Sequence, residues 1–133
     1  MSKKIKILLV EDDKAIRQMY ELKFEAEKIP VTIAIDGMDG YKIARRIKPQ
    51  IILLDLRMPK MTGDVMLEKL QKEDWIKNTH VVIMTNVNEA EAPKRLKDIG
   101  FDEFLIKAHI TPRKLLNIVK KIIKNLELKE DKL

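Results

Sequence analysis

The stretch that decides the fold is Ile-Ile-Leu-Leu-Asp-Leu-Arg-Met-Pro, residues 51–59. Its first four residues are apolar without a break and lie between two prolines, which indicates a strand buried on both faces. Asp55 directly follows that strand. Open α/β sheets place their ligand sites beyond the carboxyl ends of parallel strands. Asp55 is therefore either the cap of the next turn or a reacting group.

Similar short apolar runs recur along the chain, and each is followed by apolar residues at helical spacing. We expect strands at 5–10, 31–35, 51–54, 81–84 and 101–106. We expect helices at about 14–27, 38–47, 65–70, 92–99 and 112–126. The fourth helix is expected to start late, near 90–92, or to be distorted, because it contains Pro93. This alternation predicts an α/β three-layer sandwich, with helices on both faces of a parallel sheet.

The composition is that of one charged globular domain. The chain has 133 residues, of which 45% are hydrophobic and 36% are charged. It has no cysteine, no signal-peptide pattern and no apolar run long enough to span a bilayer, so we expect a cytoplasmic protein that does not act at a membrane. The net charge of +6 raises the question of nucleic acid, but aromatic residues are only 5% and the lysines are dispersed. We interpret the charge as a solvated surface.

Four of the expected strands end in residues with useful chemistry. Glu11 and Asp12 follow the first strand, Asp55 follows the third, Thr85 ends the fourth and Lys107 follows the fifth. The carboxyl ends of parallel strands share one edge of the sheet, so these side chains are expected to converge. The alternative is that these polar residues have no shared function, since polar residues often follow strands. The combination of acids, a hydroxyl and a lysine favours a functional site.

The chemistry of such a site is coherent. Clustered carboxylates form a hard oxygen site that suits Mg²⁺. An aspartate such as Asp55 can attack phosphorus and form an aspartyl phosphate, and a bound Mg²⁺ would offset the charge. Lys107 would contact the phosphoryl oxygens, or pair with the acids, or do both. The Thr85 hydroxyl would hydrogen-bond the attached phosphoryl group.

Four segments resemble, in order and spacing, the motifs of response-regulator receiver domains, the phosphoacceptors of two-component signalling. They are Leu-Leu-Val-Glu-Asp-Asp at 8–13, Leu-Asp-Leu-Arg-Met-Pro-Lys-Met-Thr-Gly at 54–63, Met-Thr at 84–85 and Phe-Leu-Ile-Lys at 104–107. The resemblance implies a flavodoxin-like (βα)5 fold with a five-stranded parallel sheet of order 2-1-3-4-5. We expect a receiver domain at 1–126 and a charged tail at 127–133 that extends the last helix or frays.

The resemblance also implies the acceptor and the metal ligands. Asp55 would be the phosphoacceptor. Asp12, Asp55 and the backbone carbonyl of Arg57 would hold Mg²⁺, and Glu11 would act largely through water. Asp13 lies one place beyond the acidic pair, so we interpret it as charge at a helix N-terminus.

The implied partners are other signalling proteins. A histidine kinase or phosphotransfer protein would donate the phosphoryl group. Thr85 and Phe104 match the family's switch pair, in which the hydroxyl moves towards the phosphoryl group and the ring turns inward. A downstream protein would read the state on the face formed by the fourth helix, the fifth strand and the fifth helix. Beyond its own phosphorylation and dephosphorylation, the chain is expected not to be an enzyme. No output domain follows in this sequence, so it acts alone or is a piece of a longer protein.

Several positions depart from the family's commonest pattern. Asn86 stands where the family usually has a very small residue, and its side chain is expected to crowd the phosphoryl group or restrict small donors. Ala108 stands where the family usually has proline. Thr62 replaces a common aspartate, with little expected effect. Arg57 and Val87 occupy positions that influence water access, and we expect dephosphorylation that is not fast.

Two other functions are compatible with the fold. Asn86 and Ala108 motivate a binding module that works without phosphorylation, which retained partner binding without phosphate uptake would reveal. A phosphatase with an aspartate nucleophile usually needs a second acid two residues further on, and that position holds Arg57. Turnover of a phosphate ester would revive this second alternative.

Overall fold

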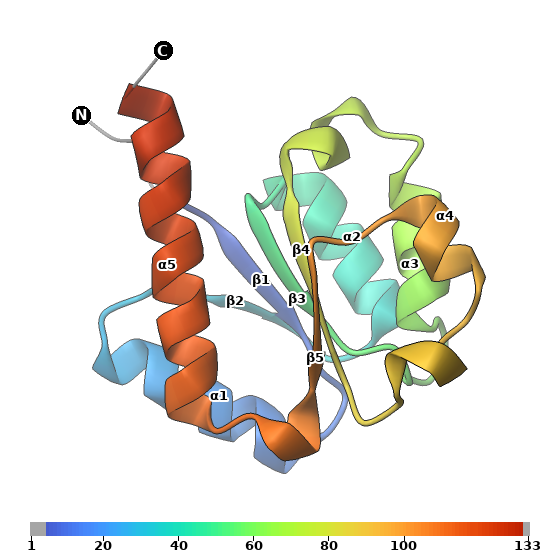
Figure 1. Cartoon of the computed structure of the whole chain (residues 1–133), viewed down its shortest axis with the longest axis horizontal. Coiled ribbons are helices and arrows are strands. Elements are labelled where there is room, and N and C mark those ends of the chain that lie inside the picture. The colour runs from blue at the N-terminus through green and yellow to red at the C-terminus, as the bar shows by residue number, and fades with distance from the viewer. Residues whose placement is uncertain (1–4, 132–133) are drawn as a thin grey trace.

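The computed structural model describes residues 5–131, which form a single parallel sheet covered by helices on both faces (Figure 1). The strands are β1 (Ile7–Val10), β2 (Thr32–Ala34), β3 (Ile51–Leu54), β4 (His80–Thr85) and β5 (Glu103–Ile106). The helices are α1 (Lys14–Ala26), α2 (Gly37–Ile47), α3 (Gly63–Leu70), α4 (Arg95–Ile99) and α5 (Pro112–Asp131). The sheet order is β2-β1-β3-β4-β5, and every pairing is parallel. The predicted α/β three-layer fold and its strand order are confirmed.

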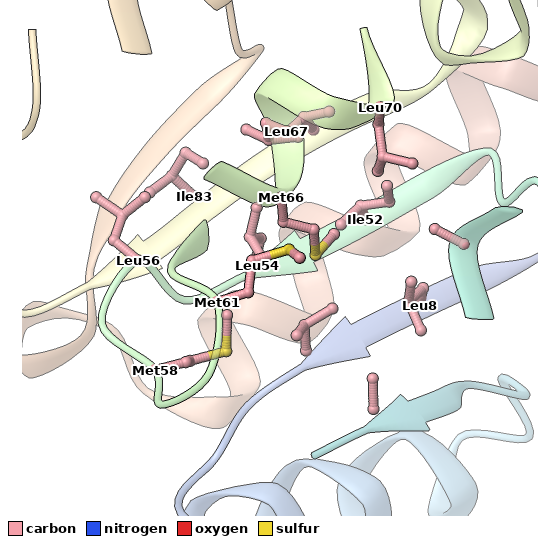
Figure 2. Close-up of a cluster of buried hydrophobic side chains, with 14 of the residues drawn as sticks. Leu8, Ile52, Leu54, Leu56, Met58, Met61, Met66, Leu67, Leu70 and Ile83 are labelled. Atoms are coloured by element: carbon pink, nitrogen blue, oxygen red, sulfur yellow. The ribbon is translucent and has the colours of Figure 1, made fainter. Parts of the chain in front are cut away.

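The central strand β3 is buried on both faces, as its unbroken apolar sequence predicts. Each of its four residues has an exposed fraction of 0%. Because successive side chains of a strand point to opposite faces, Ile52 and Leu54 enter one core and Ile51 and Leu53 enter the other. The first core lies under α2, α3 and α4 and includes Met66, Leu67 and Leu70 (Figure 2). The second lies under α1 and α5.

Local signals in the sequence set the helix ends. The Asp13 side chain accepts a hydrogen bond from the Ile16 backbone N–H at 3.0 Å, which caps α1. The Thr111 hydroxyl accepts one from the Lys114 N–H at 3.1 Å, and Pro112 opens α5. Asp13 is therefore an N-cap, in agreement with its interpretation as a helix-terminal acid.

Helix α4 is shorter than the sequence pattern predicts. The regular helix begins only at Arg95, so the expected start near 90–92 is wrong, and the alternative expectation of a segment distorted by Pro93 is confirmed. Residues Glu89–Glu91 form a separate 3₁₀ turn, and Ala92 is extended with a ψ of 156°. A residue that precedes proline is driven out of the helical region, and Pro93 has no N–H to donate. The proline therefore divides the segment, and Gly100, with a φ of 94°, ends it.

Two strands begin two residues later than predicted, and β2 begins one residue later, at Thr32. Regular pairing starts at Ile7 in β1 and at Glu103 in β5, each two residues beyond the expected start. At β5 the cause is Asp102, whose carboxylate accepts a hydrogen bond from the Val81 N–H at 2.7 Å. The Val81 N–H is thus paired with a side chain, while the Asp102 backbone N–H still donates to the Val81 carbonyl at 2.9 Å.

The last helix continues past the predicted domain boundary at 126. Helix α5 extends to Asp131, so most of the expected charged tail is helical. Residues 132 and 133 of that tail lie outside the described residues. Among the residues that the structure describes, no helix has the length and apolar character needed to cross a bilayer.

Candidate functional site

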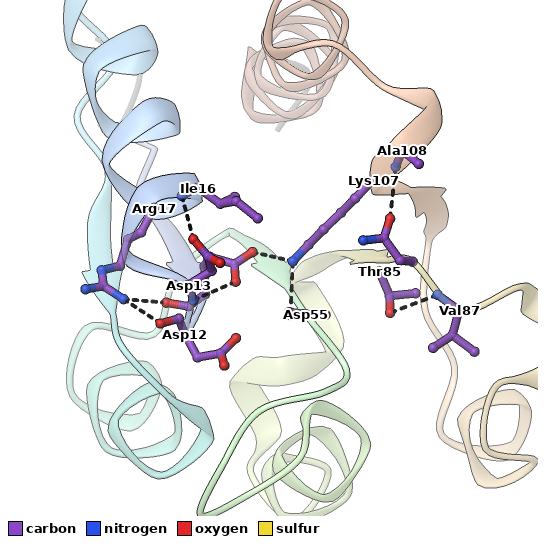
Figure 3. Close-up of polar contacts among 11 residues, drawn as sticks. Asp12, Asp13, Ile16, Arg17, Asp55, Thr85, Val87, Lys107 and Ala108 are labelled. Carbon is purple, nitrogen blue, oxygen red and sulfur yellow. Dashed lines mark hydrogen bonds and ion pairs between the residues drawn. The ribbon is translucent and has the colours of Figure 1, made fainter.

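The strand register brings the predicted side chains to one edge of the sheet. Val10 pairs with Leu54, and Leu54 pairs with Ile83. Glu11 and Asp55, which follow Val10 and Leu54, are therefore neighbours. Thr85 pairs with Ile106, so Thr85 and Lys107 emerge beside them from the last two strands. Figure 3 shows Asp12, Asp55, Thr85 and Lys107 at this common edge.

Lys107 connects the two buried acids. Its Nζ donates a hydrogen bond to Oδ2 of Asp55 at 3.0 Å and forms an ion pair with Oε1 of Glu11. The Lys107 side chain is only 10% exposed. Within the described residues the Asp55 carboxylate accepts a hydrogen bond from Lys107 and none from a backbone N–H of the following loop, which argues against Asp55 as a simple cap of that turn.

Burial and charge compete at this cluster. Burial raises the pKa of Glu11, and the hydrogen bond and charge of Lys107 only partly oppose that rise. Burial lowers the pKa of Lys107, but the nearby carboxylates of Glu11 and Asp55 outweigh it, so its pKa is raised above 10.5. Lys107 is thus held as a cation.

Glu11 has protein partners for both of its carboxylate oxygens. Oε1 contacts Lys107, and Oε2 accepts a hydrogen bond from the Asp13 N–H at 3.0 Å. Arg17 stabilises the loop between β1 and α1, because its guanidinium donates hydrogen bonds to the backbone carbonyls of Glu11 and Asp12 at 3.0 and 3.2 Å. Sequence reasoning missed this role of Arg17, because nothing in the sequence around a helical arginine indicates that it binds the backbone of the preceding loop.

Three acids are placed where a cation would fit. One carboxylate oxygen from each of Glu11, Asp12 and Asp55 lies within 4.8 Å of the others. Asp12 is exposed, so the cluster opens to solvent on one side. Mg²⁺ prefers hard oxygen ligands, and this cluster of three acids and one lysine carries more negative than positive charge. The residues present therefore fit the predicted metal.

The predicted switch residues differ in burial. Thr85 is 1% exposed, and its hydroxyl oxygen accepts a hydrogen bond from the Val87 N–H at 3.3 Å. Phe104 is half-buried, packs against the core beside α4 and lies 5.7 Å from Phe101 between ring centroids. The hydroxyl and the aromatic ring thus belong to adjacent strands.

Two further predicted positions lie in the loop between β3 and α3. Arg57 is exposed, and within the described part of the chain it forms no ion pair. Thr62 is exposed and precedes α3. The loop approaches the acceptor closely at Gly63, where an added Cβ would lie 2.3 Å from the carbonyl oxygen of Asp55.

Asn86 and Ala108 contact each other. The Asn86 Oδ1 accepts a hydrogen bond from the Ala108 backbone N–H at 3.0 Å (Figure 3). Sequence reasoning singled out both positions as departures but did not pair them. The sequence did contain a signal: compared with the common family pattern, Asn86 adds a side-chain acceptor and Ala108 adds a backbone N–H donor that proline lacks.

Comparisons with known proteins agree with this arrangement. Residues 7–120 match the response regulator receiver domain family. A DNA-binding dual master transcriptional regulator, RpaA of Synechocystis sp., is 28% identical over 77% of this chain and 42% of its own length. A protein-glutamate methylesterase/protein-glutamine glutaminase of Methanospirillum hungatei JF-1 is 32% identical over 86% of this chain and 33% of its own length. The chain thus spans less than half the length of these two relatives.

Solved structures show the same fold. A CheY-like response regulator receiver domain protein from Methanospirillum hungatei JF-1 has a TM-score of 0.83 and 26% identity, and the match covers 96% of this chain and 99% of that one. The family match extends over most of the sequence and includes every residue of the acidic cluster. The chain therefore belongs to the response regulator receiver domain family.

Proposed function

We propose that the chain is a phosphoacceptor that takes a phosphoryl group on Asp55 from a histidine kinase or phosphotransfer protein, in a reaction that depends on Mg²⁺. The observation that carries this proposal is the contact of Lys107 Nζ with Asp55 Oδ2 at 3.0 Å beside the acids of β1. A buried carboxylate held next to a cation, within reach of two further acids, is the arrangement that acyl phosphate formation requires.

In this reaction an oxygen of the Asp55 carboxylate attacks the phosphorus of the donor. A new bond forms between that oxygen and phosphorus, and the bond from phosphorus to the donor breaks, with its electron pair leaving on the donor. Lys107 already contacts the acceptor, so its ammonium is placed to stabilise the phosphoryl oxygens as they arrive. Thr85 would then donate its hydroxyl hydrogen to the attached group.

The metal would be held by the carboxylates of Glu11, Asp12 and Asp55 and by the backbone carbonyl of Arg57. Bound Mg²⁺ would supply positive charge that offsets repulsion between the carboxylates and the phosphoryl oxygens. Glu11 acts chiefly on Lys107 here, because its Oε1 is already paired with that ammonium. Asp12 is the exposed member of the cluster and is the residue most accessible to the ion.

The signal would leave through the side of the sheet that carries β5. Thr85 is the last residue of β4, and Phe104 lies on β5 beside the short helix α4. Movement of the Thr85 hydroxyl towards a phosphoryl group would free space for the half-buried ring and shift a pre-existing equilibrium at the α4–β5–α5 face. A partner protein would bind that face. The cytoplasmic location and the absence of direct nucleic-acid binding stay predictions.

Intact-mass measurement after incubation with acetyl phosphate and Mg²⁺ tests the proposal. The wild-type chain is expected to gain one phosphoryl group. Asp55→Asn and a chelated sample are expected to gain none, whereas Asp98→Asn, which changes an exposed aspartate on α4, behaves as wild type. Failure of the wild type to gain mass from acetyl phosphate and from a competent histidine kinase would refute the proposal.

A further inference from the structure

The turn that carries Lys107 follows an edge strand and therefore borders a single neighbouring strand. It is the 3₁₀ turn Lys107–His109, which directly follows β5. β5 is an edge strand and pairs only with β4. The end of β4 is therefore the one strand end beside this turn. Asn86, the residue after β4, supplies the contact between them.

The hydrogen bond from the Ala108 N–H to Asn86 Oδ1, 3.0 Å long, acts on the backbone of Lys107. The N–H belongs to the peptide group that joins Lys107 to Ala108. Only the oxygen of the Asn86 amide can accept, so the bond also fixes which way that amide is turned. Lys107 is thus held at both ends, at its backbone by Asn86 and at its ammonium by Glu11 and Asp55.

The two departures from the common sequence pattern depend on each other. A proline at position 108 would have no N–H to donate, and a very small residue at position 86 would have no side-chain amide to accept. Asn86 therefore has a structural role, which is to accept the hydrogen bond of Ala108 on the next loop. This role is separate from any crowding of the phosphoryl site by its side chain.

We propose that Asn86 is a positioning residue for Lys107: it holds the turn after β5 so that the ammonium stays against Glu11 and Asp55. A lysine side chain loses much rotational freedom when it is fixed, and a rigid backbone attachment reduces that loss. The inference rests on the proposed function for its meaning in phosphoryl transfer. The contact and its effect on Mg²⁺ can be measured without phosphate.

The first experiment follows amide hydrogen exchange at Ala108 by NMR. Asn86→Ala is expected to speed exchange of the Ala108 N–H about tenfold, the scale of one lost hydrogen bond. Asn88→Ala is the matched control, because Asn88 lies exposed in the same loop and makes no side-chain cap. Unchanged exchange in Asn86→Ala would overturn the inference.

The second experiment asks whether Asn86 acts through Lys107. A loosened Lys107 competes less for the carboxylates, so Asn86→Ala is expected to bind Mg²⁺ roughly threefold more tightly, yet to accept phosphate roughly threefold more slowly. In a Lys107→Met background the same substitution should change neither quantity. A merely structural defect would weaken both.

Three results of this second experiment would contradict the inference. The first is Mg²⁺ affinity that does not respond to Asn86→Ala. The second is a response that persists in Lys107→Met. The third is faster phosphoryl transfer in both backgrounds, which would show that Asn86 only blocks donors. If the wild type accepts no phosphate but the Mg²⁺ pattern holds, the proposed function fails and this inference stands.

Discussion

Lys107 Nζ lies 3.0 Å from Oδ2 of Asp55, although the two residues are 52 positions apart in the chain. Between them the chain completes two strands and two helices, and the parallel register returns it to the same edge. The cation is also paired with Glu11. One ammonium thus bridges the proposed acceptor and an acid of the adjacent strand.

Removing this ammonium should separate metal binding from phosphoryl transfer. Lys107→Met leaves the carboxylates without their cation, so Mg²⁺ is expected to bind more tightly. Phosphorylation by acetyl phosphate is expected to slow by about 10²-fold, because a donor to the phosphoryl oxygens is lost. Titration calorimetry and time-resolved intact mass measure the two effects. Lys124→Met, an exposed substitution on α5, is the control, and equal losses in both variants would contradict the role of Lys107.

The raised pKa of Lys107 predicts that the free energy of unfolding falls at alkaline pH. Burial lowers the pKa of Lys107, but Glu11 and Asp55 raise it further, to a value above the ordinary 10.5. A group with a raised pKa in the folded state contributes stability that is fully present below its unfolded pKa and is lost as the pH rises through the folded one. In metal-free buffer, Lys107→Met is expected to cost about 3 kcal/mol near neutral pH.

That cost should shrink once the pH passes 10.5. Urea unfolding of both proteins across this range measures the difference in unfolding free energy. Burial raises the pKa of Tyr20 and the charge of Lys107 lowers it, so both proteins carry Tyr20→Phe in this comparison to remove the phenol from the titration. A difference that stays constant with pH would show that Lys107 contributes by packing and not by charge.

The strands and the convergence of the site could be predicted from the sequence because both depend on short-range patterns. An unbroken apolar run indicates a doubly buried strand, and parallel strands place the residues after them in one row. This is why Glu11, Asp55 and Lys107, far apart in sequence, were expected together and are in contact.

The loops could not be predicted in the same way. The start of α4 depends on how Pro93 and Ala92 divide the segment, and the pairing of Asn86 with Ala108 depends on the relative position of two loops. The spacing of apolar residues along the sequence predicts neither the start of α4 nor the contact between these two loops. The fastening of the first loop by Arg17 is equally invisible, since the contacted groups are backbone carbonyls.

Adjacent aspartates should behave differently when changed. Asp12→Asn removes a charge from the three-acid cluster, and it is expected to weaken Mg²⁺ binding at least about tenfold. Asp13 caps α1 through its side chain, so Asp13→Ala is expected to cost about 1 kcal/mol of stability and to leave Mg²⁺ affinity unchanged. Calorimetric Mg²⁺ titration and urea unfolding of both variants test this. The reverse pattern would place the metal at Asp13.

Gly63 should be required for both folding and the acceptor geometry. A Cβ at this position would lie 2.3 Å from the Asp55 carbonyl oxygen and 3.1 Å from the Leu56 Cα, and neither backbone atom can move alone. Gly63→Ala is therefore expected to cost about 2 kcal/mol or more, and to slow phosphorylation because the acceptor backbone shifts.

Gly40→Ala is the matched comparison, because its added Cβ would meet only side-chain atoms of Val10 and Met66, at 2.9 to 3.0 Å. It lies within α2, where alanine is favoured over glycine, so its net cost should be smaller. Urea unfolding ranks the two variants, and intact mass after acetyl phosphate measures transfer in each. If Gly63→Ala is as stable and as active as Gly40→Ala, the loop yields readily, and close packing at Gly63 does not hold Asp55 in place.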